Sequence, residues 1–304
     1  MVPVVLDCDP GHDDVFAILL AAAHPAIDLR AITTVAGNGT LAQVTENALR
    51  VCALAGITGI PVAASPKTSE TATAPEIHGA SALDGADLPA PADLLVEQDA
   101  VTLMANLLEQ QRLTIIATGP LTNVAALLDR RPDLKPDIVF MGGSAGRGNW
   151  RPLAEFNIWA DPQAADKVLS SGLRITMCGL DVTHQALATP DVFERLQAMS
   201  TPLARTCADL LRFFQSTYDT VFGMPDPPVH DPVAVAAVAR PGLLEFVEAP
   251  VEVELTGTHT RGATVVDLHG VTGRPPNARM AMHLDRPGFW DVMLSAIERL
   301  GRES

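Results

Sequence analysis

The 304-residue sequence has few cysteines and no long hydrophobic run, and these absences exclude several classes of protein. The four cysteines lie far apart with no CxxC pair, so the sequence predicts neither a zinc site of that spacing nor a dense disulfide framework. No stretch of 18 apolar residues occurs, which argues against a membrane span. The chain enters its first apolar segment without the basic residues of a signal peptide. We therefore expect a cytoplasmic protein with no membrane partner.

Basic residues are also scarce. The sequence holds 21 Lys and Arg against 36 Asp and Glu, for a formal net charge of −15. A phosphate backbone would be repelled by this charge, and no local basic cluster offsets it, so we expect no nucleic-acid partner. The acidity is compatible with a divalent-cation site, but the net charge alone does not indicate one. We expect most of these carboxylates to lie on the solvated surface.

The residues that are present predict a compact α/β protein. Hydrophobic residues make up 47% of the chain and charged residues 19%, as in globular proteins. Short apolar runs alternate with helical patterns, which predicts a three-layer, open, mostly parallel, Rossmann-like sheet with helices on both faces. Strands are expected at 2–6, 29–35, 60–64, 113–117, 137–141 and 174–178, and helices at 14–23, 41–54, 100–108, 121–128 and 162–169.

Two regions depart from this alternation. Residues 65–95 are rich in Pro, Ala, Ser and Asp and contain Ile77-His78-Gly79, which predicts a functional loop, because loops of this length without secondary structure are uncommon. After about residue 185, extra C-terminal helices, including one at 203–221, are expected to precede a β-rich stretch at 246–268. A further strand at 279–284 and a final helix follow. No linker interrupts the chain, so we expect a single domain over residues 1–304.

The segment Asp7-Cys8-Asp9-Pro10-Gly11-His12-Asp13-Asp14 places four carboxylates within eight residues. It follows an apolar strand and precedes an apolar helix, and in an open α/β sheet that junction lies at the edge where ligands bind. Four neighbouring anions repel one another, and a hard divalent cation with oxygen ligands commonly offsets such repulsion. Gly11 allows a tight turn, and an Asp can cap the helix.

Three other interpretations explain this segment less well. Helix capping explains one or two Asp residues but not four. An EF-hand is excluded by spacing, because the glycine is at loop position five and Ile18 occupies the place of the bidentate Glu. A phosphatase of the haloacid dehalogenase type also begins with a strand and Asp-x-Asp, but that pattern expects Thr or Val where Gly11 stands.

With its Asp-x-Asp-Pro-Gly-x-Asp-Asp segment, the sequence resembles the nucleoside hydrolase family. The resemblance continues nearly to the end of the chain through Gly37-Asn38-Gly39, Ile77-His78-Gly79, Ala117-Thr118-Gly119-Pro120-Leu121-Thr122-Asn123, Met141-Gly142-Gly143, Ala154-Glu155-Phe156-Asn157-Ile158 and His230-Asp231-Pro232. It implies hydrolysis of the N-glycosidic bond of a small-molecule ribonucleoside to free base and ribose. It also implies a Ca²⁺ cofactor and a homo-oligomer, either a dimer or a tetramer.

The resemblance also implies a metal site. Asp9, Asp14, Thr118 and Asp231 would bind calcium, which takes six to eight oxygen ligands. Thr118 follows an apolar run, so its backbone carbonyl can face the crevice, although a plain strand-to-helix turn is the alternative. Asp231 precedes an apolar helix and could be only its cap. Asp9 is expected to act as the general base that takes a proton from a calcium-bound water.

Substrate contacts are likewise implied by the resemblance. Asp13 would accept a hydrogen bond from the 2'-hydroxyl of ribose, which favours ribose over deoxyribose. Asn38, Asn149, Glu155 and Asn157 are the remaining candidates for binding the sugar. Each of these four, taken alone, could equally be a turn or surface residue.

Leaving-group residues are expected around the base. His230 precedes a predicted metal ligand and could donate a proton to the base, because a His can do so near neutral pH. His78, in the long loop, is a second candidate near the ribose or base. Met141, Phe156 and Tyr218, the only tyrosine, are expected as walls of the base site, although Met and Phe in such runs also belong to cores.

The sequence does not name the base. A His at position 230 favours broad or pyrimidine-preferring enzymes over those that stack purines between tryptophans, and none of Trp150, Trp159 and Trp290 is obviously base-facing. A non-catalytic, calcium-dependent ribose or nucleoside binding protein is the alternative from another functional class, and a metal-dependent phosphatase is the third.

Overall fold

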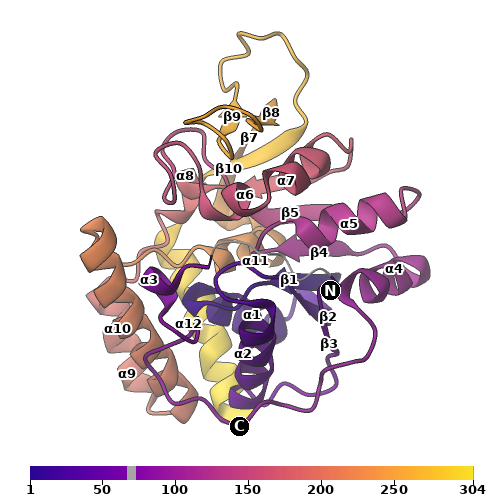
Figure 1. Ribbon diagram of the computed structural model, residues 1–304. Helices are drawn as coiled ribbons and strands as arrows, with labels where there is room; N and C mark the ends of the chain where they lie inside the picture. Colours follow the sequence, from indigo (N-terminus) through magenta and orange to yellow (C-terminus); the bar gives the residue numbers. More distant parts are fainter. Residues whose placement is uncertain (67–72, 304) are drawn as a thin grey trace.

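The computed structural model describes residues 1–66 and 73–303, and its central feature is an eight-stranded sheet (Figure 1). All neighbouring strands pair in parallel except β7, which is antiparallel to β10. In spatial order the strands are β3 (Val62–Ala64), β2 (Ile27–Thr34), β1 (Val2–Cys8), β4 (Thr114–Ala117), β5 (Asp137–Met141), β6 (Ile175–Cys178), β10 (Ala278–Leu284) and β7 (Leu244–Ala249).

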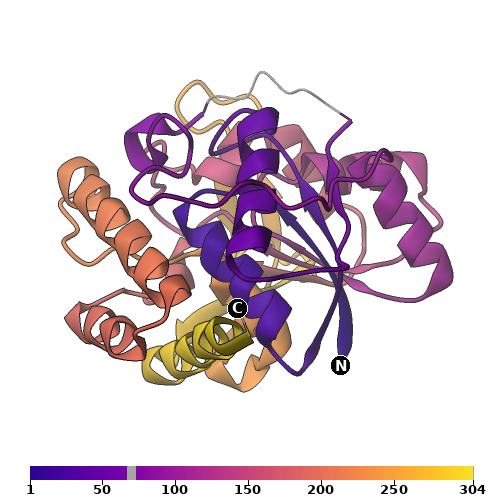
Figure 2. The ribbon, with the colours of Figure 1, turned by 90° about the horizontal axis from the view of Figure 1, so that it is seen from below.

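Helices cover both faces of this sheet (Figures 1 and 2). One face carries α1 (His12–Ala23), α2 (Leu41–Leu54), α9 (Pro190–Met199), α10 (Pro202–Phe222), α11 (Asp231–Ala239) and α12 (Arg286–Glu303). The other carries α4 (Ala100–Gln110), α5 (Thr122–Arg130) and α7 (Pro162–Leu169). Shorter elements are α3 (Pro75–His78), α6 (Phe156–Ala160), α8 (Leu180–Thr183) and the 3₁₀ helix η1 (Pro241–Leu243). Within the described ranges, no helix is long and apolar enough to cross a membrane.

Side chains of the central strands divide between two hydrophobic cores. In β1, Val4 and Leu6 belong to the core beneath α1, whereas Val5 belongs to the core beneath α5. In β4, Ile116 faces the first core and Ile115 the second. This alternation follows from the two-residue period of a strand, and it confirms the expected three-layer architecture.

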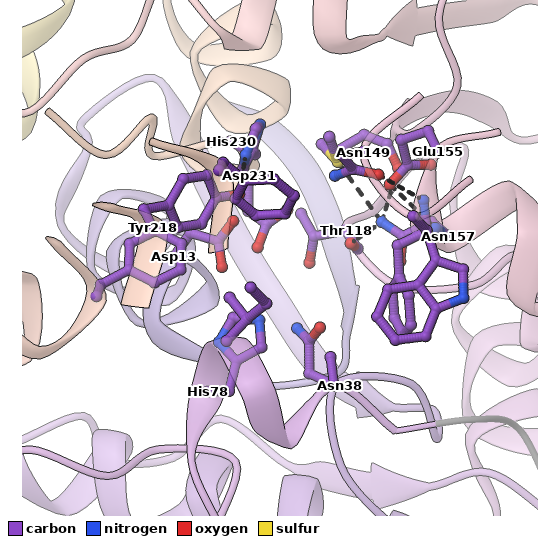
Figure 3. Close-up of a pocket in the computed structure, with 17 residues that line it drawn as sticks. Asp13, Asn38, His78, Thr118, Asn149, Glu155, Asn157, Tyr218, His230 and Asp231 are labelled. Atoms are coloured by element: carbon purple, nitrogen blue, oxygen red, sulfur yellow. Dashed lines mark hydrogen bonds between the residues drawn. The ribbon is translucent and has the colours of Figure 1, made fainter. Parts of the chain in front are cut away.

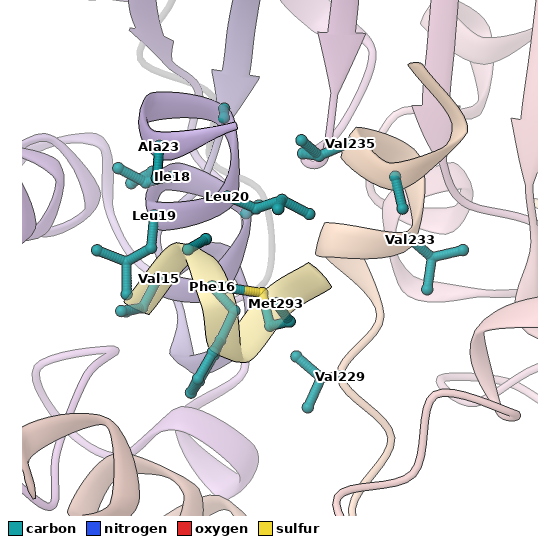
Figure 4. Close-up of a cluster of buried hydrophobic side chains, with 14 of the residues drawn as sticks. Val15, Phe16, Ile18, Leu19, Leu20, Ala23, Val229, Val233, Val235 and Met293 are labelled. Atoms are coloured by element: carbon teal, nitrogen blue, oxygen red, sulfur yellow. The ribbon is translucent and has the colours of Figure 1, made fainter. Parts of the chain in front are cut away.

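Helix α1 lies inside the molecule. Its residues from Val15 to Ala21 are at most 1% exposed, as expected for a helix that is apolar on every side. Figure 4 shows Phe16 and Leu20 of α1 packed among side chains of α11 and α12. Burying a side chain of this size contributes about 1.5–3 kcal/mol, so α1 is held firmly by its surroundings. The turn that precedes it is therefore a well-supported place for functional groups.

The start of α1 differs from the expected boundary. The helix begins at His12, two residues before the predicted Asp14. The backbone N–H of Gly11 donates to Asp14 Oδ2 at 3.0 Å, so the carboxylate in the first turn holds the chain in a helical path from His12 onward. Asp14 thus contributes to capping without being the first helical residue.

The C-terminal part extends the main sheet. The β-rich stretch predicted at 246–268 divides into β7, which joins the main sheet, and a separate pair formed by β8 (Val251–Val253) and β9 (Thr264–Val266). Strand β10 pairs in parallel with β6, and β7 then pairs with β10. Of the loop predicted at 65–95, residues 67–72 lie outside the described residues, and the rest contains the short helix α3.

Candidate active site

The candidate site lies where the strand order reverses. From β1 the chain proceeds to β2 and β3 on one side, while β4, β5 and β6 follow on the other, and ligands of open α/β sheets bind at such a switch point. The acidic turn follows β1, and Thr118 follows β4. The Thr118 backbone N–H donates to the Asp7 carbonyl oxygen at 2.8 Å, which ties the two strand ends together.

A cavity that is open to solvent lies at this point. Every predicted site residue except Asp9 and Asp14 lines it, and those two are fully buried beside it. Figure 3 shows Asn149, Glu155 and Asn157 on one side of the cavity and Tyr218 and His230 on the other. The lining residues predicted from sequence are Asp13, Asn38, His78, Thr118, Met141, Asn149, Glu155, Phe156, Asn157, Tyr218, His230 and Asp231.

Asp9, Asp13, Asp14 and Asp231 form what we call the acidic wall. Carboxylate oxygens of Asp13, Asp14 and Asp231 all lie within 4.8 Å of one another. The sequence assigned Asp13 to the sugar, but the structure also groups it with two predicted metal ligands. The described residues that line the cavity include no Lys or Arg, so no protein cation neutralises these carboxylates there.

Hydrogen bonds hold two of these carboxylates in place. Asp14 Oδ1 accepts from the Thr118 hydroxyl at 2.8 Å, and its Oδ2 accepts from the Asn38 amide at 3.2 Å. Asp9 Oδ2 accepts from the Asn38 backbone N–H at 2.7 Å. A side chain at Gly37 would collide with that oxygen, so a glycine is required for the backbone to approach Asp9 so closely.

Burial and mutual repulsion disfavour ionisation of the acidic wall. Burial, followed by the neighbouring carboxylates, raises the pKa of Asp13 to about 8 and that of Asp9 and Asp231 well above the usual range. In the described part of the chain, Asp9 Oδ1 and Asp13 Oδ1 are buried with no hydrogen-bond partner. Buried oxygen atoms without donors, grouped on one wall, fit a hard divalent cation such as Ca²⁺.

The opposite side of the cavity is built around Glu155. Its carboxylate accepts from the backbone N–H groups of Gly143 at 2.9 Å and of Asn157 at 3.0 Å, and it caps α6. Burial nevertheless raises its pKa to about 7. The Asn157 amide donates to the Thr118 carbonyl oxygen at 2.7 Å, so Asn157 positions the carbonyl that was predicted as a metal ligand. The Phe156 backbone N–H donates to Asn149 Oδ1 at 3.0 Å.

Phe214, Tyr218, Phe222 and His230 form what we call the aromatic wall. The first three are spaced four residues apart on α10, so they share one face of that helix. The ring centroids of Phe214 and Tyr218 are 4.6 Å apart in an edge arrangement. The Tyr218 hydroxyl lies 2.7 Å from His230 Nε2, and the Thr183 hydroxyl lies 2.8 Å from His230 Nδ1.

His78 connects the long loop to the acidic turn. It ends α3, lines the cavity, and its Nδ1 accepts from the His12 backbone N–H at 3.2 Å. The His12 ring contacts the Asp84 carbonyl oxygen through Nε2 at 2.7 Å and stacks on His78 and Phe214. The described part of the loop is therefore attached directly to the turn that carries the carboxylates.

Comparison with known proteins decides the family. The model of the inosine-uridine preferring nucleoside hydrolases matches residues 4–291, which is almost the whole chain. The chain belongs to the nucleoside hydrolase family. This confirms the resemblance found in the sequence and supports hydrolysis of ribonucleosides as the class of reaction.

Similar members of the family have been named for their substrates. The chain is 45% identical over 309 aligned residues to the pyrimidine-specific ribonucleoside hydrolase RihA of Shewanella woodyi, covering 99% of both chains. It is 44% identical over 305 residues to RihA of Escherichia coli O9:H4, covering 97% of this chain and 98% of the relative.

Solved structures of nucleoside hydrolases share the fold. A purine-preferring ribonucleoside hydrolase from Gardnerella vaginalis superposes with a TM-score of 0.91 at 31% identity, covering 99% of this chain and 100% of that one. The plant nucleoside hydrolase PpNRh1 gives a TM-score of 0.88 at 28% identity, covering 98% and 99%. These matches confirm the three-layer α/β architecture of this nucleoside hydrolase.

Several cavity residues were missed in the sequence. Trp150 lines the cavity and packs edge-on against Phe156, although the sequence did not single it out as a site residue. Trp290 is a core residue, as expected for a side chain 1% exposed. Phe214 and Phe222 could have been found from their spacing around Tyr218 on one helix. Thr183 does not line the cavity but contacts His230. No sequence pattern predicts this contact, because the two residues are 47 positions apart.

Proposed function

We propose that this nucleoside hydrolase cleaves the N-glycosidic bond of pyrimidine ribonucleosides with water, releasing the base and ribose. The observation that carries the proposal is that the acidic wall and the aromatic wall lie side by side at one cavity. Preference for pyrimidines is supported by the relatives at 44–45% identity, which are named pyrimidine-specific. The purine-preferring structure is more distant in sequence, at 31% identity.

The proposed metal is calcium, held by Asp9, Asp14 and Asp231 and by the backbone carbonyl of Thr118. The grouping of buried carboxylate oxygens and the two unpartnered oxygen atoms support this assignment. Asp13 shares the same cluster of oxygen atoms, so it lies close to whatever the metal holds. When bound, a calcium ion would supply Lewis-acid chemistry, lowering the pKa of water and orienting hydroxyl groups of the sugar.

Asp9 is the proposed general base. Its Oδ2 is fixed by the Asn38 backbone N–H at 2.7 Å, while its Oδ1 has no partner among the described residues. A carboxylate with one oxygen held and the other free is oriented to accept a proton from the attacking water. Asp13 lines the cavity and is the proposed acceptor of the 2'-hydroxyl hydrogen bond, which would favour ribose over deoxyribose.

Ribose is proposed to lie beside Asn149, Glu155 and Asn157. These side chains are grouped on one side of the cavity, and Asn38 lies at its lower edge in Figure 3. Hydroxyl groups need both donors and acceptors, and this group of amides with one carboxyl supplies both. Met141 also lines the cavity and offers an apolar contact to the sugar ring.

The base is proposed to lie against the aromatic wall. Flat apolar rings of Tyr218 and Phe214 suit the face of a pyrimidine. His230 and Tyr218 form a hydrogen-bonded pair there, and this pair is the proposed donor to the leaving base. His78 and Phe156 complete the lining and are proposed as binding residues.

Two other functions fit the site less well. A phosphatase needs cationic groups for the phosphate, and the described residues lining the cavity include no Lys or Arg. A non-catalytic nucleoside binding protein needs no general base, and the unpartnered Oδ1 of Asp9, with Oδ2 held by the Asn38 backbone N–H, supports the hydrolase over this alternative.

Sugar release tests the proposal. Reducing sugar would be measured from uridine, cytidine and inosine, with calcium and after exhaustive chelation, with uridine 5'-phosphate as the phosphatase control. Ribose released faster from uridine and cytidine than from inosine, and only with calcium, is the expected result. Tight uridine binding without ribose release would establish the binding protein instead, and phosphate release would establish the phosphatase.

Further proposals concern the surroundings of the site. We propose that residues 1–304 form one domain, because β10 and β7 from the C-terminal part complete the sheet that begins at β1. A cytoplasmic location is proposed, since the four cysteines are free and buried. A homo-oligomer, dimer or tetramer, is proposed from the family resemblance, and light scattering coupled to size exclusion measures it.

A further inference from the structure

Asp7 is the one carboxylate of the acidic turn that the proposed function leaves without a role. It is fully buried near the end of β1 and is not among the described residues that line the cavity. Its backbone carbonyl oxygen accepts from the Thr118 backbone N–H at 2.8 Å, and its Oδ1 accepts from the Asn123 side-chain amide at 2.8 Å. Asp7 therefore contacts both ends of residues 118–123, which lead from β4 into α5.

The amide nitrogen of Asn123 joins two neighbouring strands. Besides donating to Asp7 in β1, Nδ2 donates to the backbone carbonyl oxygen of Thr34 in β2 at 3.1 Å. A primary amide carries two N–H groups, so both of them are used. Asn123 Oδ1 has no hydrogen-bond partner in the described part of the chain, so the contacts of this side chain are made by its nitrogen. Asn123 is 1% exposed and, like Asp7, is not among the described residues of the cavity lining.

Helix α5 depends on such contacts because its first turn has no side-chain cap. The residue before the helix is Leu121, which has no side-chain oxygen to accept a backbone N–H. The first two helical residues instead bind other segments: the Thr122 hydroxyl donates to Asp161 Oδ2 at 2.7 Å, and Asn123 binds β1 and β2. The start of α5 is therefore held by groups outside the helix.

The residues between these contacts carry two parts of the proposed reaction centre. Thr118 lines the cavity, its carbonyl is a proposed metal ligand, and its hydroxyl donates to Asp14 Oδ1 at 2.8 Å (Figure 3). Gly119 packs directly on the proposed general base, since a Cβ atom at this position would lie 2.6 Å from Asp9 Oδ1. A displacement of this backbone would therefore change both the metal ligand and the surroundings of Asp9.

We propose that Asn123 is a positioning residue for the metal site: by binding the ends of β1 and β2 with one amide, it holds residues 118–122 where the Thr118 carbonyl can reach the cation. This inference rests on the proposed function. Calcium binds oxygen ligands at about 2.3–2.6 Å, so a displaced carbonyl is lost as a ligand. Asn123 has no place in the cavity lining and acts through Thr118, as residues behind metal ligands commonly do.

Calcium affinity tests this role. Asn123→Leu keeps the approximate size of the side chain but removes both N–H groups, so the calcium Kd should rise about 10–100-fold. Isothermal titration calorimetry on the chelated protein measures this Kd without any substrate. Saturating calcium should restore most of the uridine turnover, because the bound ion draws the carbonyl back into place, and KM for uridine should change little.

The control removes an equivalent amide elsewhere. Asn277 Nδ2 also donates to two backbone carbonyl oxygens, those of Leu169 at 3.0 Å and Val251 at 2.9 Å, and Asn277 is not among the described residues that line the cavity. Asn277→Leu should lower the thermal unfolding midpoint but leave the calcium Kd unchanged. An unchanged Kd in Asn123→Leu, or equal weakening in both variants, would overturn the positioning role. The proposed function fails separately, if the parent protein binds no calcium or releases no ribose from uridine.

A measurement on the parent protein does not depend on how the variants fold. If Asn123 holds residues 118–122 before the cation binds, the backbone N–H of Thr118 should stay bound to the Asp7 carbonyl in calcium-free protein. Its hydrogen exchange, followed by NMR after chelation, should be as slow as that of amides within β1. Fast exchange that becomes slow only with calcium would overturn the proposal even if Asn123→Leu could not be purified.

Discussion

The two walls of the cavity differ in their charge and in the interactions that they offer to a ligand. The acidic wall gathers four buried carboxylates, and burial, followed by the neighbouring carboxylates, raises the pKa of Asp9, Asp13 and Asp231. We propose that a cation completes this wall. The aromatic wall is neutral: its rings pack against one another, and both nitrogens of its histidine have hydrogen-bond partners. In the proposed function, the first wall binds the metal and carries the general base, and the second binds the leaving base. Changes in the acidic wall should affect catalysis and metal binding most, whereas changes in the aromatic wall should act through the base.

The largest effect is expected from Asp9→Asn. This change keeps the size of the side chain but removes the carboxylate that accepts the proton, so kcat for uridine should fall by about 10³-fold. Without calcium, the thermal unfolding midpoint should not fall, because the change removes a buried charge. Asp28→Asn, at a half-buried position of β2 far from the cavity lining, is the control and should keep full activity. Near-normal turnover in Asp9→Asn would refute the assignment of the base.

Calcium should stabilise the acidic wall by a measurable amount. At a calcium concentration of about 100 times Kd, binding adds about 2.7 kcal/mol of stability, which corresponds to a rise of about 5 °C in the unfolding midpoint. Differential scanning fluorimetry after chelation and readdition measures this shift.

Asp231→Asn sharpens this test of the metal. The variant should lose the calcium shift, and without calcium it should unfold at a higher temperature than the parent, because one buried anion has been removed. Asp28→Asn should retain the shift. An unchanged calcium shift in Asp231→Asn would show that the ion binds elsewhere.

The aromatic wall should respond to removal of one hydroxyl. Tyr218→Phe keeps the ring packed against Phe214 but removes the donor to the base, so kcat for uridine should fall about 30-fold with little change in KM. The rate with 4-nitrophenyl β-D-ribofuranoside, which releases a nitrophenolate that delocalises its own charge, should change far less. Equal losses on the two substrates would mean that Tyr218 shapes the cavity without assisting departure of the base.

The smallest effect is expected from Trp150→Phe. Trp150 lines the cavity and packs edge-on against Phe156, so a smaller ring should weaken substrate binding and raise KM about threefold at unchanged kcat. Trp290→Phe is the matched control, because this residue is 1% exposed in the core. It should lower the unfolding midpoint and leave KM unchanged. The reverse pattern in the two variants would contradict the placement of Trp150.

Contiguous features of the site could be predicted from the sequence, whereas contacts between distant segments could not. The acidic turn follows a strand directly, so the order of residues alone placed it at the sheet edge. The pairing of β10 with β6 was not predicted, because strands that join across about 100 intervening residues leave no local pattern. Trp150 was not identified as a cavity residue for a similar reason, since loop residues have no periodicity that shows which way they face. The contact between Thr183 and His230 joins two residues that are 47 positions apart, and no sequence motif predicts it.

The contiguity of the acidic turn also bears on how such enzymes can diversify. Asp9, Asp13 and Asp14 lie within six consecutive residues, whereas Tyr218, His230 and His78 come from three separate elements. If the proposed roles hold, substitutions on α10 or in the long loop would change the recognised base one position at a time, without disturbing the acidic turn. That the same fold is shared with a purine-preferring enzyme at a TM-score of 0.91 agrees with this separation. For an engineer, the helix and the loop are the places to introduce variation, and the turn is the place to leave alone.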